Sequence, residues 1–194
     1  MATRRRISRD EILEGAAQIL NAGVFGDLTV DSLARQLHMS KSTLYKHFAS
    51  KEELIVGLVD SLCRRAERDL EEAHLTGDAA KALETVARVY GDHAARLPRA
   101  VILQRSRLPA PSQDRIQLTA ATVGRAARAI IKRGAVDGVF LDGRAQLAAT
   151  SFLASAQAAV EAAARGELEM SRDEAVQATY KLLLPGITGQ FENA

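Results

Sequence analysis

Apolar residues recur three and four positions apart along almost the whole chain, and this spacing predicts a protein built of helices. Ile12, Ala16 and Leu20 form the first such stripe, between an N-cap serine at Ser8 and Gly23. Glycine and proline residues interrupt the pattern at intervals. The sequence therefore predicts an all-α fold of about nine helices, within residues 8–23, 29–37, 41–48, 51–73, 79–96, 98–103, 112–133, 143–165 and 171–185.

Two short helices joined by a tight turn are predicted between residues 28 and 51. Thr29 is the expected N-cap of the first helix, whose apolar stripe includes Leu33 and Leu37. Residues 38–40 form the turn, and Ser40 is placed to cap the second helix. A capping box of Ser50 and Glu53 then opens a long third helix. This arrangement predicts a helix-turn-helix unit.

The second short helix, over residues 41–48, has one apolar face and one polar face. At about 100° per residue, Leu44 and Phe48 lie close together and define the inward face. The outward and flanking positions carry hydroxyls, a phenol, an ammonium group and an imidazole, on Ser42, Thr43, Tyr45, Lys46 and His47. Hydroxyl and ammonium groups donate to phosphate oxygens and to base edges, so this face suits DNA.

The residues of this region resemble the DNA-binding signature of TetR-type (TetR/AcrR) transcriptional regulators. The match runs through residues 29–34, 39–48 and 50–54, and its most specific part is the run Leu-Tyr-x-His-Phe-x-x-Lys-Glu that begins at Leu44. Ser42 departs from the family pattern, because many members carry glycine there. The resemblance covers about the first quarter of the chain. It implies a helix-turn-helix DNA-binding domain over residues 1–51 and a larger helical effector-binding and dimerisation domain over residues 52–194.

The resemblance also implies roles for individual residues. Ser42 and Lys46 are expected to face base edges, while His47 either bonds a phosphate or only flanks Phe48. A basic arm before the first helix is expected to reach DNA, although a solvated terminus is the alternative. The full set of expected DNA-binding residues is Arg4, Arg5, Arg6, Thr29, Lys41, Ser42, Thr43, Tyr45, Lys46, His47 and Lys51.

The last two predicted helices are apolar over a wide arc, so each must be covered on two sides. The family analogy assigns them to a homodimer with a four-helix interface, and the alternative is that both are central core helices. The expected interface residues are Phe152, Ala156, Ala159, Val160, Val176, Thr179 and Leu183. An unknown small-molecule effector is expected among the helices of residues 52–165, and the candidate lining residues are Tyr90, His93, Arg105, Gln117, Phe152 and Gln157.

Composition supports this interpretation without adding chemistry. The chain is 47% hydrophobic and 26% charged, which is typical of a globular protein. No apolar run approaches the roughly 18 residues of a membrane span, and no signal peptide is recognisable, so a cytoplasmic protein without a membrane partner is expected. The single cysteine, Cys63, cannot form an internal disulfide. Residues 1–51 contain eight basic and five acidic residues, an excess of positive charge that favours DNA.

The sequence also bears on two other classes of function. An enzyme would need a nucleophile–base pair or a cluster of metal ligands, but the four histidines lack the His-x-x-x-His spacing and no glycine-rich phosphate loop is present. We therefore expect no catalysis, no metal and no cofactor. A DNA-binding protein whose C-terminal domain binds a partner and takes no effector remains an alternative, which a thermal-shift screen of metabolites would test. The main prediction is a ligand-responsive repressor that binds a near-palindromic operator as a homodimer.

Overall fold

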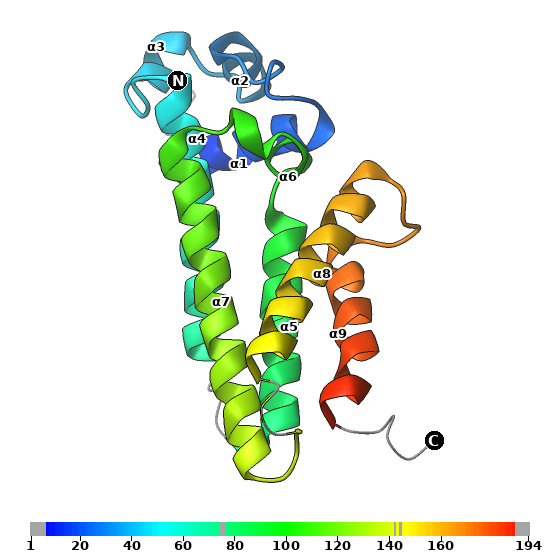
Figure 1. The fold of residues 1–194 in the computed structure, drawn as a ribbon. Helices are drawn as coiled ribbons and strands as arrows, with labels where there is room; N and C mark the ends of the chain where they lie inside the picture. The colour runs from blue at the N-terminus through cyan, green and yellow to red at the C-terminus, as the bar shows by residue number, and fades with distance from the viewer. Residues whose placement is uncertain (1–6, 74–76, 142, 144, 189–194) are drawn as a thin grey trace. The chain divides into compact units, whose positions relative to one another are not determined.

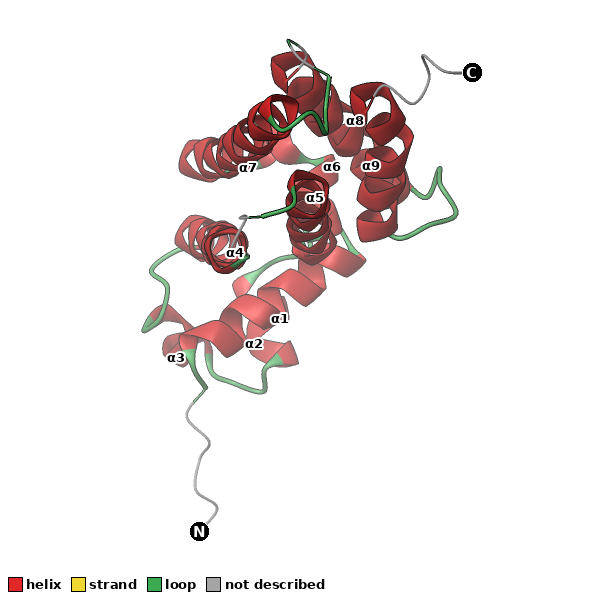
Figure 2. Ribbon diagram, turned by 90° about the horizontal axis from the view of Figure 1, so that it is seen from below, coloured by secondary structure: helices red, strands yellow, loops and turns green. Residues whose placement is uncertain are grey.

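The computed structural model describes residues 7–73, 77–141, 143 and 145–188. Within these residues the chain is helical, with no strand (Figures 1 and 2), and the predicted all-α fold of about nine helices is confirmed. The elements are α1 (Arg9–Ala22), α2 (Val30–Gln36), α3 (Lys41–Tyr45), α4 (Lys51–Glu72), α5 (Ala79–Arg96), α6 (Arg99–Leu103), the 3₁₀ helix η1 (Arg105–Arg107), α7 (Ala110–Val136), α8 (Ala145–Arg165) and α9 (Arg172–Thr188).

The chain divides into two compact units. One consists of Met1–Ser61 and Leu97–Arg115, and the other of Leu62–Arg96 and Ile116–Ala194. The helices α4 and α7 each contribute residues to both units. The boundary expected after residue 51 divides a DNA-binding domain from an effector-binding and dimerisation domain, and it remains a prediction. The two compact units are divided differently, because residues 97–115 belong with the N-terminal helices.

In the first unit, α1 packs against α2 and α6, and α2 packs against α3. The predicted capping box at the start of α1 is confirmed, since the Glu11 N–H donates to Ser8 Oγ and the Ser8 N–H donates to Glu11 Oε2. Ile12, Leu20 and Leu33 are fully buried and form the core of this unit. Burial of one stripe on each short helix fixes which face remains exposed.

Two hydrogen bonds hold the segment around α6 to the end of α1. The Arg99 N–H donates to Asn21 Oδ1 over 3.2 Å, and the Phe25 N–H donates to Gln104 Oε1 over 3.4 Å. Both pairs join residues almost eighty positions apart in the sequence. The N-terminal unit therefore includes a segment that the sequence pattern assigned to the C-terminal domain.

In the second unit, α9 packs against both α8 and α5 (Figure 1). At Gly91 on α5, an added Cβ would lie 3.3 Å from the Asp173 carbonyl oxygen, so the absence of a side chain permits a close approach of α5 and α9. The Arg172 guanidinium donates to the Ala95 carbonyl near the end of α5 over 2.7 Å. Burial lowers the pKa of Arg172 from its ordinary value.

The ends of two helices differ from the sequence prediction. Gly134 was expected to follow the helix of residues 112–133, but α7 continues to Val136 and Gly134 is buried within it. A Cβ at Gly134 would lie less than 3 Å from both the Phe140 ring and Ala79, so this glycine makes room for a core aromatic. At the other end of the unit, α9 continues through Pro185 to Thr188. The Asp142 side chain, expected to cap α8, lies outside the described residues.

None of the helices in the described part of the chain is both long enough and apolar enough to cross a membrane.

Candidate nucleic-acid interface

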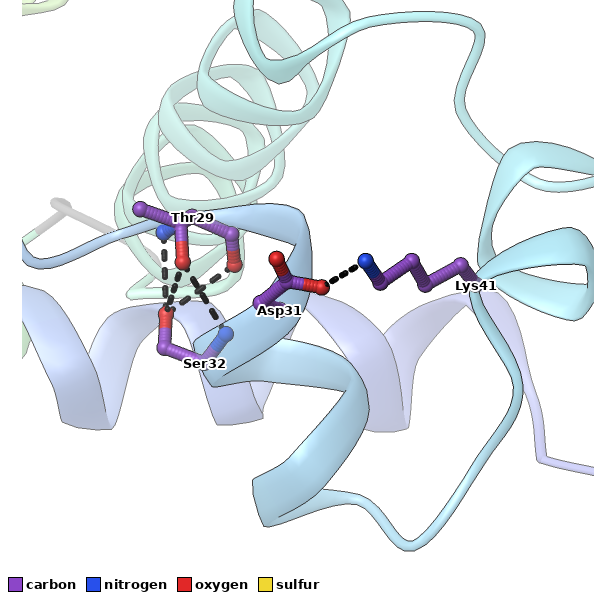
Figure 3. A network of polar contacts seen from close by, with 4 residues as sticks. All are labelled: Thr29, Asp31, Ser32 and Lys41. Atoms are coloured by element: carbon purple, nitrogen blue, oxygen red, sulfur yellow. Dashed lines mark hydrogen bonds and ion pairs between the residues drawn. The ribbon is translucent and has the colours of Figure 1, made fainter.

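The first helix of the helix-turn-helix, α2, begins at a network of hydroxyl groups (Figure 3). The Ser32 N–H donates to Thr29 Oγ1 over 3.0 Å, and the Thr29 N–H donates to Ser32 Oγ over 2.9 Å. The Ser32 hydroxyl also donates to the Asp27 carbonyl over 2.7 Å. Thr29 is therefore the predicted N-cap of α2, with serine in the position where a capping box usually has glutamate or glutamine.

The turn between α2 and α3 contains a residue with a positive φ. His38 has a φ of 50°, in the left-handed region that few non-glycine residues adopt. The Met39 N–H, one residue on, returns to the Ala34 carbonyl over 2.9 Å. The left-handed residue and this hydrogen bond lie between the end of α2 and the start of α3.

Ser40 caps α3, as predicted, by accepting the Thr43 N–H over 3.2 Å. Its hydroxyl also lies 2.9 Å from Ser42 Oγ and 2.8 Å from Thr43 Oγ1. The three hydroxyls form a cluster at the start of the helix. Such groups can donate to or accept from a DNA backbone or base.

The helix α3 is shorter than predicted, because its regular part ends at Tyr45 and not at Phe48. The N–H groups of Lys46 and His47 reach back only three residues, which tightens the last turn. The two predicted apolar positions are nevertheless both buried, with Leu44 and Phe48 each 3% exposed. The outward face is also as predicted: Ser42, Tyr45 and Lys46 are exposed.

Two lysines expected at DNA are engaged within the chain. Lys41 forms an ion pair with Asp31, which joins the starts of α2 and α3 (Figure 3). Lys51 is half-buried, and its Nζ donates to the Phe25 carbonyl over 2.6 Å. Neither partner was anticipated, since Asp31 and Phe25 are related to these lysines by no helical spacing. The arm residues Arg4, Arg5 and Arg6 lie outside the described residues.

Arg9 supports the α3–α4 junction, a role that the sequence pattern missed. Its guanidinium donates to the His47 carbonyl over 2.8 Å and lies 4.1 Å from the centre of the Phe48 ring. The same group approaches Glu53 at 3.7 Å. Glu53 also accepts the Ala49 N–H over 2.7 Å, while its own N–H donates to Ser50 Oγ, which gives the predicted cap of α4. These contacts fix where the polar face of α3 points.

A second feature, in the other unit, is an apolar pocket of about 210 Å³ between α5, α7, α8 and α9. Its described lining includes Leu83, Ala127, Ile131, Phe152 and Leu183. None of the lining residues that the structure describes is charged, and hydroxyl groups come only from Ser151 and Tyr180. The pocket has the size and character of a site for a small apolar molecule.

The structure brings together only some of the expected pocket residues. Phe152 lines the pocket. The Tyr90 ring lies edge-on to the Phe152 ring, with 6.3 Å between the two ring centroids. His93 is buried on α5, whereas Gln117 and Gln157 are exposed, and Gln157 donates to Glu161. Arg105 belongs to η1 in the first unit. The candidates expected from the sequence are polar or aromatic, whereas the pocket is lined mainly by aliphatic side chains.

The expected dimer residues are mostly covered within the chain itself. Phe152, Ala156, Val160, Val176 and Thr179 are buried, while Ala159 and Leu183 are half-buried. The large exposed apolar side chains of these two helices are others: Leu147 on α8 is 68% exposed and Leu182 on α9 is 76% exposed. Ala154 and Ala158 extend the exposed surface along α8.

In the part of the chain that the structure describes, no three His, Cys, Asp or Glu side chains gather as a metal site would require.

Residues 12–58 match the family model described as bacterial regulatory proteins, tetR family. The HTH-type transcriptional regulator EthR of Mycolicibacterium smegmatis is 36% identical over 62 residues, which cover 32% of this chain and 29% of that protein. The nucleoid occlusion factor SlmA of Aliivibrio fischeri is 35% identical over 105 residues, 50% of this chain and 52% of that protein. The chain thus spans about half the length of these relatives, or less.

Solved structures extend the likeness to the whole fold. A putative transcriptional regulator from Saccharomonospora viridis, in complex with choline, aligns with a TM-score of 0.78 at 20% identity, over 92% of this chain and 96% of that one. The regulator FadR from Bacillus subtilis, in complex with stearoyl-CoA, aligns with a TM-score of 0.73 at 17% identity, over 93% and 100%. Residues 12–58 thus match the DNA-binding region of the tetR family, and the chain shares the fold of these solved regulators.

Proposed function

We propose that this protein is a sequence-specific transcriptional repressor that occupies an operator as a homodimer and leaves it when a small molecule binds in the second unit. The observation that carries this proposal is the outward face of α3. Ser42, Tyr45 and Lys46 are exposed there while Leu44 and Phe48 are buried beneath them. A short helix held in this way can enter the major groove and present its polar side chains to base edges.

The contacts within the chain support a division of roles among the DNA-binding residues. Ser42 and Lys46 are assigned to base edges, because both are exposed on the outward face. Thr43 and Tyr45, on its flanks, are assigned to phosphates. Lys41 and Lys51 act first inside the protein, through Asp31 and the Phe25 carbonyl, so their contribution to DNA binding is indirect.

Thr29 and His47 are also assigned mainly to positioning. The Thr29 hydroxyl is the cap of α2, and the His47 carbonyl accepts from Arg9. The basic arm of Arg4, Arg5 and Arg6 is assigned to the DNA backbone, where its charge would release counterions.

The dimer is proposed to form through the exposed faces of α8 and α9. Leu147 and Leu182 are large apolar side chains that a second copy would remove from water. A two-fold pair of recognition helices reads a near-palindromic site whose half-sites are about 34–36 Å apart, or a multiple of that spacing. The partners of the protein are then double-stranded DNA, a second copy and one effector.

The effector is proposed to act by linkage through the apolar pocket. A ligand that binds the DNA-free conformation more tightly lowers operator affinity, with a coupling of about 1–3 kcal/mol in typical systems. α5 and α7, which line the pocket, are the helices that precede and follow α6 and η1 in the chain. Such a regulator would work in the cytoplasm, where DNA is accessible, without catalysing a reaction.

Selection of bound fragments from a random DNA pool tests the proposal, with the purified full chain as bait. We expect an inverted repeat, and we expect Lys46→Ala to relax the preference at one position of each half-site, since each good base contact discriminates by about 1–3 kcal/mol. A chain that is monomeric at micromolar concentration and shows no salt-sensitive preference for any duplex would refute the proposal.

A further inference from the structure

The apolar pocket of the second unit also indicates what kind of molecule enters it. Its volume is about 210 Å³. An apolar cavity of roughly 150 Å³ in another protein stays dry and takes up a benzene-sized molecule. A compact apolar ligand would therefore fill this pocket, whereas the bulk of a nucleotide or of a long acyl chain would have to lie outside it.

The lining offers little to a charged group. Among the described residues, only Ser151 and Tyr180 present hydroxyls to the pocket, and no side chain there is charged. The Tyr180 hydroxyl already donates to the Ala80 carbonyl over 3.4 Å, so it remains able to accept one hydrogen bond. Transfer of an unpaired ion from water into such surroundings is strongly unfavourable, while a single neutral hydroxyl could be satisfied.

Glu84 and Asp78 place negative charge near the Tyr180 phenol, at one end of the pocket. Burial, together with the carboxylates of Glu84 and Asp78, raises the pKa of Tyr180 to about 12. These groups would repel an anionic head placed beside Tyr180. Neither carboxylate lines the pocket, so neither can pair directly with a buried cation.

One wall of the pocket is formed by the end of α9, where a proline interrupts the helical hydrogen bonds. Leu183, Leu184, Gly186 and Ile187 line it from the end of α9, and Pro185 lies among them. Proline has no N–H and removes one bond of the helix ladder. The end of α9 is held to the chain that follows α7 by the Leu141 N–H, which donates to the Ile187 carbonyl over 2.8 Å. On α8, the lining residue Leu147 is largely exposed in the single chain, so it marks an edge of the pocket that the proposed second copy would cover.

We infer that the effector is a compact, uncharged, largely apolar molecule with at most one hydrogen-bonding group, which Ser151 or Tyr180 would receive. This inference rests on the proposed function, because it names the chemical class of the ligand that the repressor would sense. It distinguishes this chain from the relative solved with choline, a cation, and from the relative solved with stearoyl-CoA, an anion.

Three probes that share one hexyl chain test the charge rule on the full-length protein: 1-hexanol, hexanoate and hexylammonium, each at pH 7.5. We expect 1-hexanol to raise the Tm and to give saturable heat in calorimetric titration. Hexanoate and hexylammonium should bind at least about tenfold more weakly, because each would bury an unpaired charge. Equal or tighter binding of either ion, or no binding of 1-hexanol up to its solubility limit, overturns the inference.

Filled variants locate the probe. Ala127 and Ala148 line the pocket from α7 and α8, whereas Ala129 on α7 is exposed and lies outside the lining. Ala127→Leu and Ala148→Leu should each reduce 1-hexanol affinity at least about fivefold, since the added carbons occupy its volume. Ala129→Leu should leave it unchanged. Circular dichroism identifies the folded variants, and the second filled variant serves if the buried Ala127 does not tolerate leucine.

Undiminished 1-hexanol affinity in a folded filled variant would place the alcohol elsewhere and overturn the inference. Failure of this inference is distinguishable from failure of the proposed function. A chain that selects an inverted repeat but prefers hexanoate contradicts only the ligand class. A chain that selects no DNA contradicts the repressor function, whatever it binds in the pocket.

Discussion

Lys51 Nζ lies 2.6 Å from the carbonyl oxygen of Phe25, and the N–H of the same Phe25 donates to Gln104 over 3.4 Å. Phe25, in the α1–α2 loop, is thus hydrogen-bonded both to Lys51 at the start of α4 and to Gln104 between α6 and η1. Lysine at this position would be assigned to phosphate by analogy, but its first partner is the protein. Because of these contacts, an experiment can distinguish a positioning role of Lys51 from a role in contacting DNA.

Lys51→Met should lower the free energy of unfolding by about 1 kcal/mol, because it removes a hydrogen bond donated by a charged group that is half-buried. Operator affinity should fall with little change in its salt dependence. Lys46→Met is the matched control: its exposed ammonium is assigned to DNA in both subunits, so the slope of log affinity against log salt should fall by about two per dimer while the Tm is unchanged. An equal loss in the slope for Lys51→Met would contradict the positioning role.

Tyr45→Ala should weaken operator binding at least about tenfold and leave thermal unfolding nearly unchanged. The side chain is 52% exposed on α3, so its removal creates no cavity, whereas the proposed phosphate contact would be lost. Fluorescence anisotropy with a labelled operator measures the affinity. Tyr45→Phe, which keeps the ring, separates the hydroxyl from the packing, and full affinity in the alanine variant would rule out the phosphate role.

Asp31→Asn should increase operator affinity several-fold at low salt, because it frees the Lys41 ammonium from its ion pair (Figure 3). Both side chains are more than half exposed, so the pair contributes only about 0–1 kcal/mol to stability and the Tm should hardly change. The gain should vanish in the double variant Asp31→Asn/Lys41→Met. Affinity that does not respond to Asp31→Asn would mean that Lys41 does not approach DNA.

His38→Val should destabilise the protein by about 1–2 kcal/mol, since a β-branched residue fits poorly at a φ of 50°. His38→Asn should be nearly neutral, because asparagine tolerates the left-handed region. Urea unfolding of the three proteins measures the difference. Equal stability of the valine and asparagine variants would show that the turn relaxes to a different backbone conformation.

The pKa of Tyr180, raised to about 12, predicts a loss of stability in alkali. The neutral phenol is favoured in the folded state, so the contribution is fully present below the ordinary pKa near 10 and is lost as the pH rises through 12. Tyr180→Phe should therefore show a flatter decline in unfolding free energy between about pH 10 and 12. Parallel declines in the two proteins would exclude this origin, since lysines titrate equally in both.

The helix caps and the buried helix faces could be predicted from the sequence, because they depend on residues only a few positions apart. The caps at Ser8, Thr29 and Ser40 and the buried pair of Leu44 and Phe48 are all as expected. Each follows from a helix period or from a side chain that reaches an adjacent N–H. Burial of Leu44 and Phe48 determines which face of α3 is exposed, so helical periodicity alone predicts the candidate DNA surface.

Contacts between distant residues could not be predicted in this way. Gly134 has the pattern of a helix stop, but the Phe140 ring packs against it and the helix continues. The partners of Lys41 and Lys51 depend on how α2 and the α1–α2 loop fold back, which no spacing encodes. The pocket combines residues from four helices and is mainly aliphatic, so the expectation of polar or aromatic lining residues includes Phe152 but none of the other residues that line it.

Pro185 also makes ligand binding in the pocket observable by hydrogen exchange. The Lys181 carbonyl lacks its usual ladder donor there, and the last turn of α9 ends one side of the pocket. That turn should open by itself, well before the unit as a whole, so its amide protons should exchange with heavy water faster than those of the preceding turns. Occupancy of the pocket would then register as slower deuterium uptake at Gly186, Ile187 and Thr188, against an otherwise constant background.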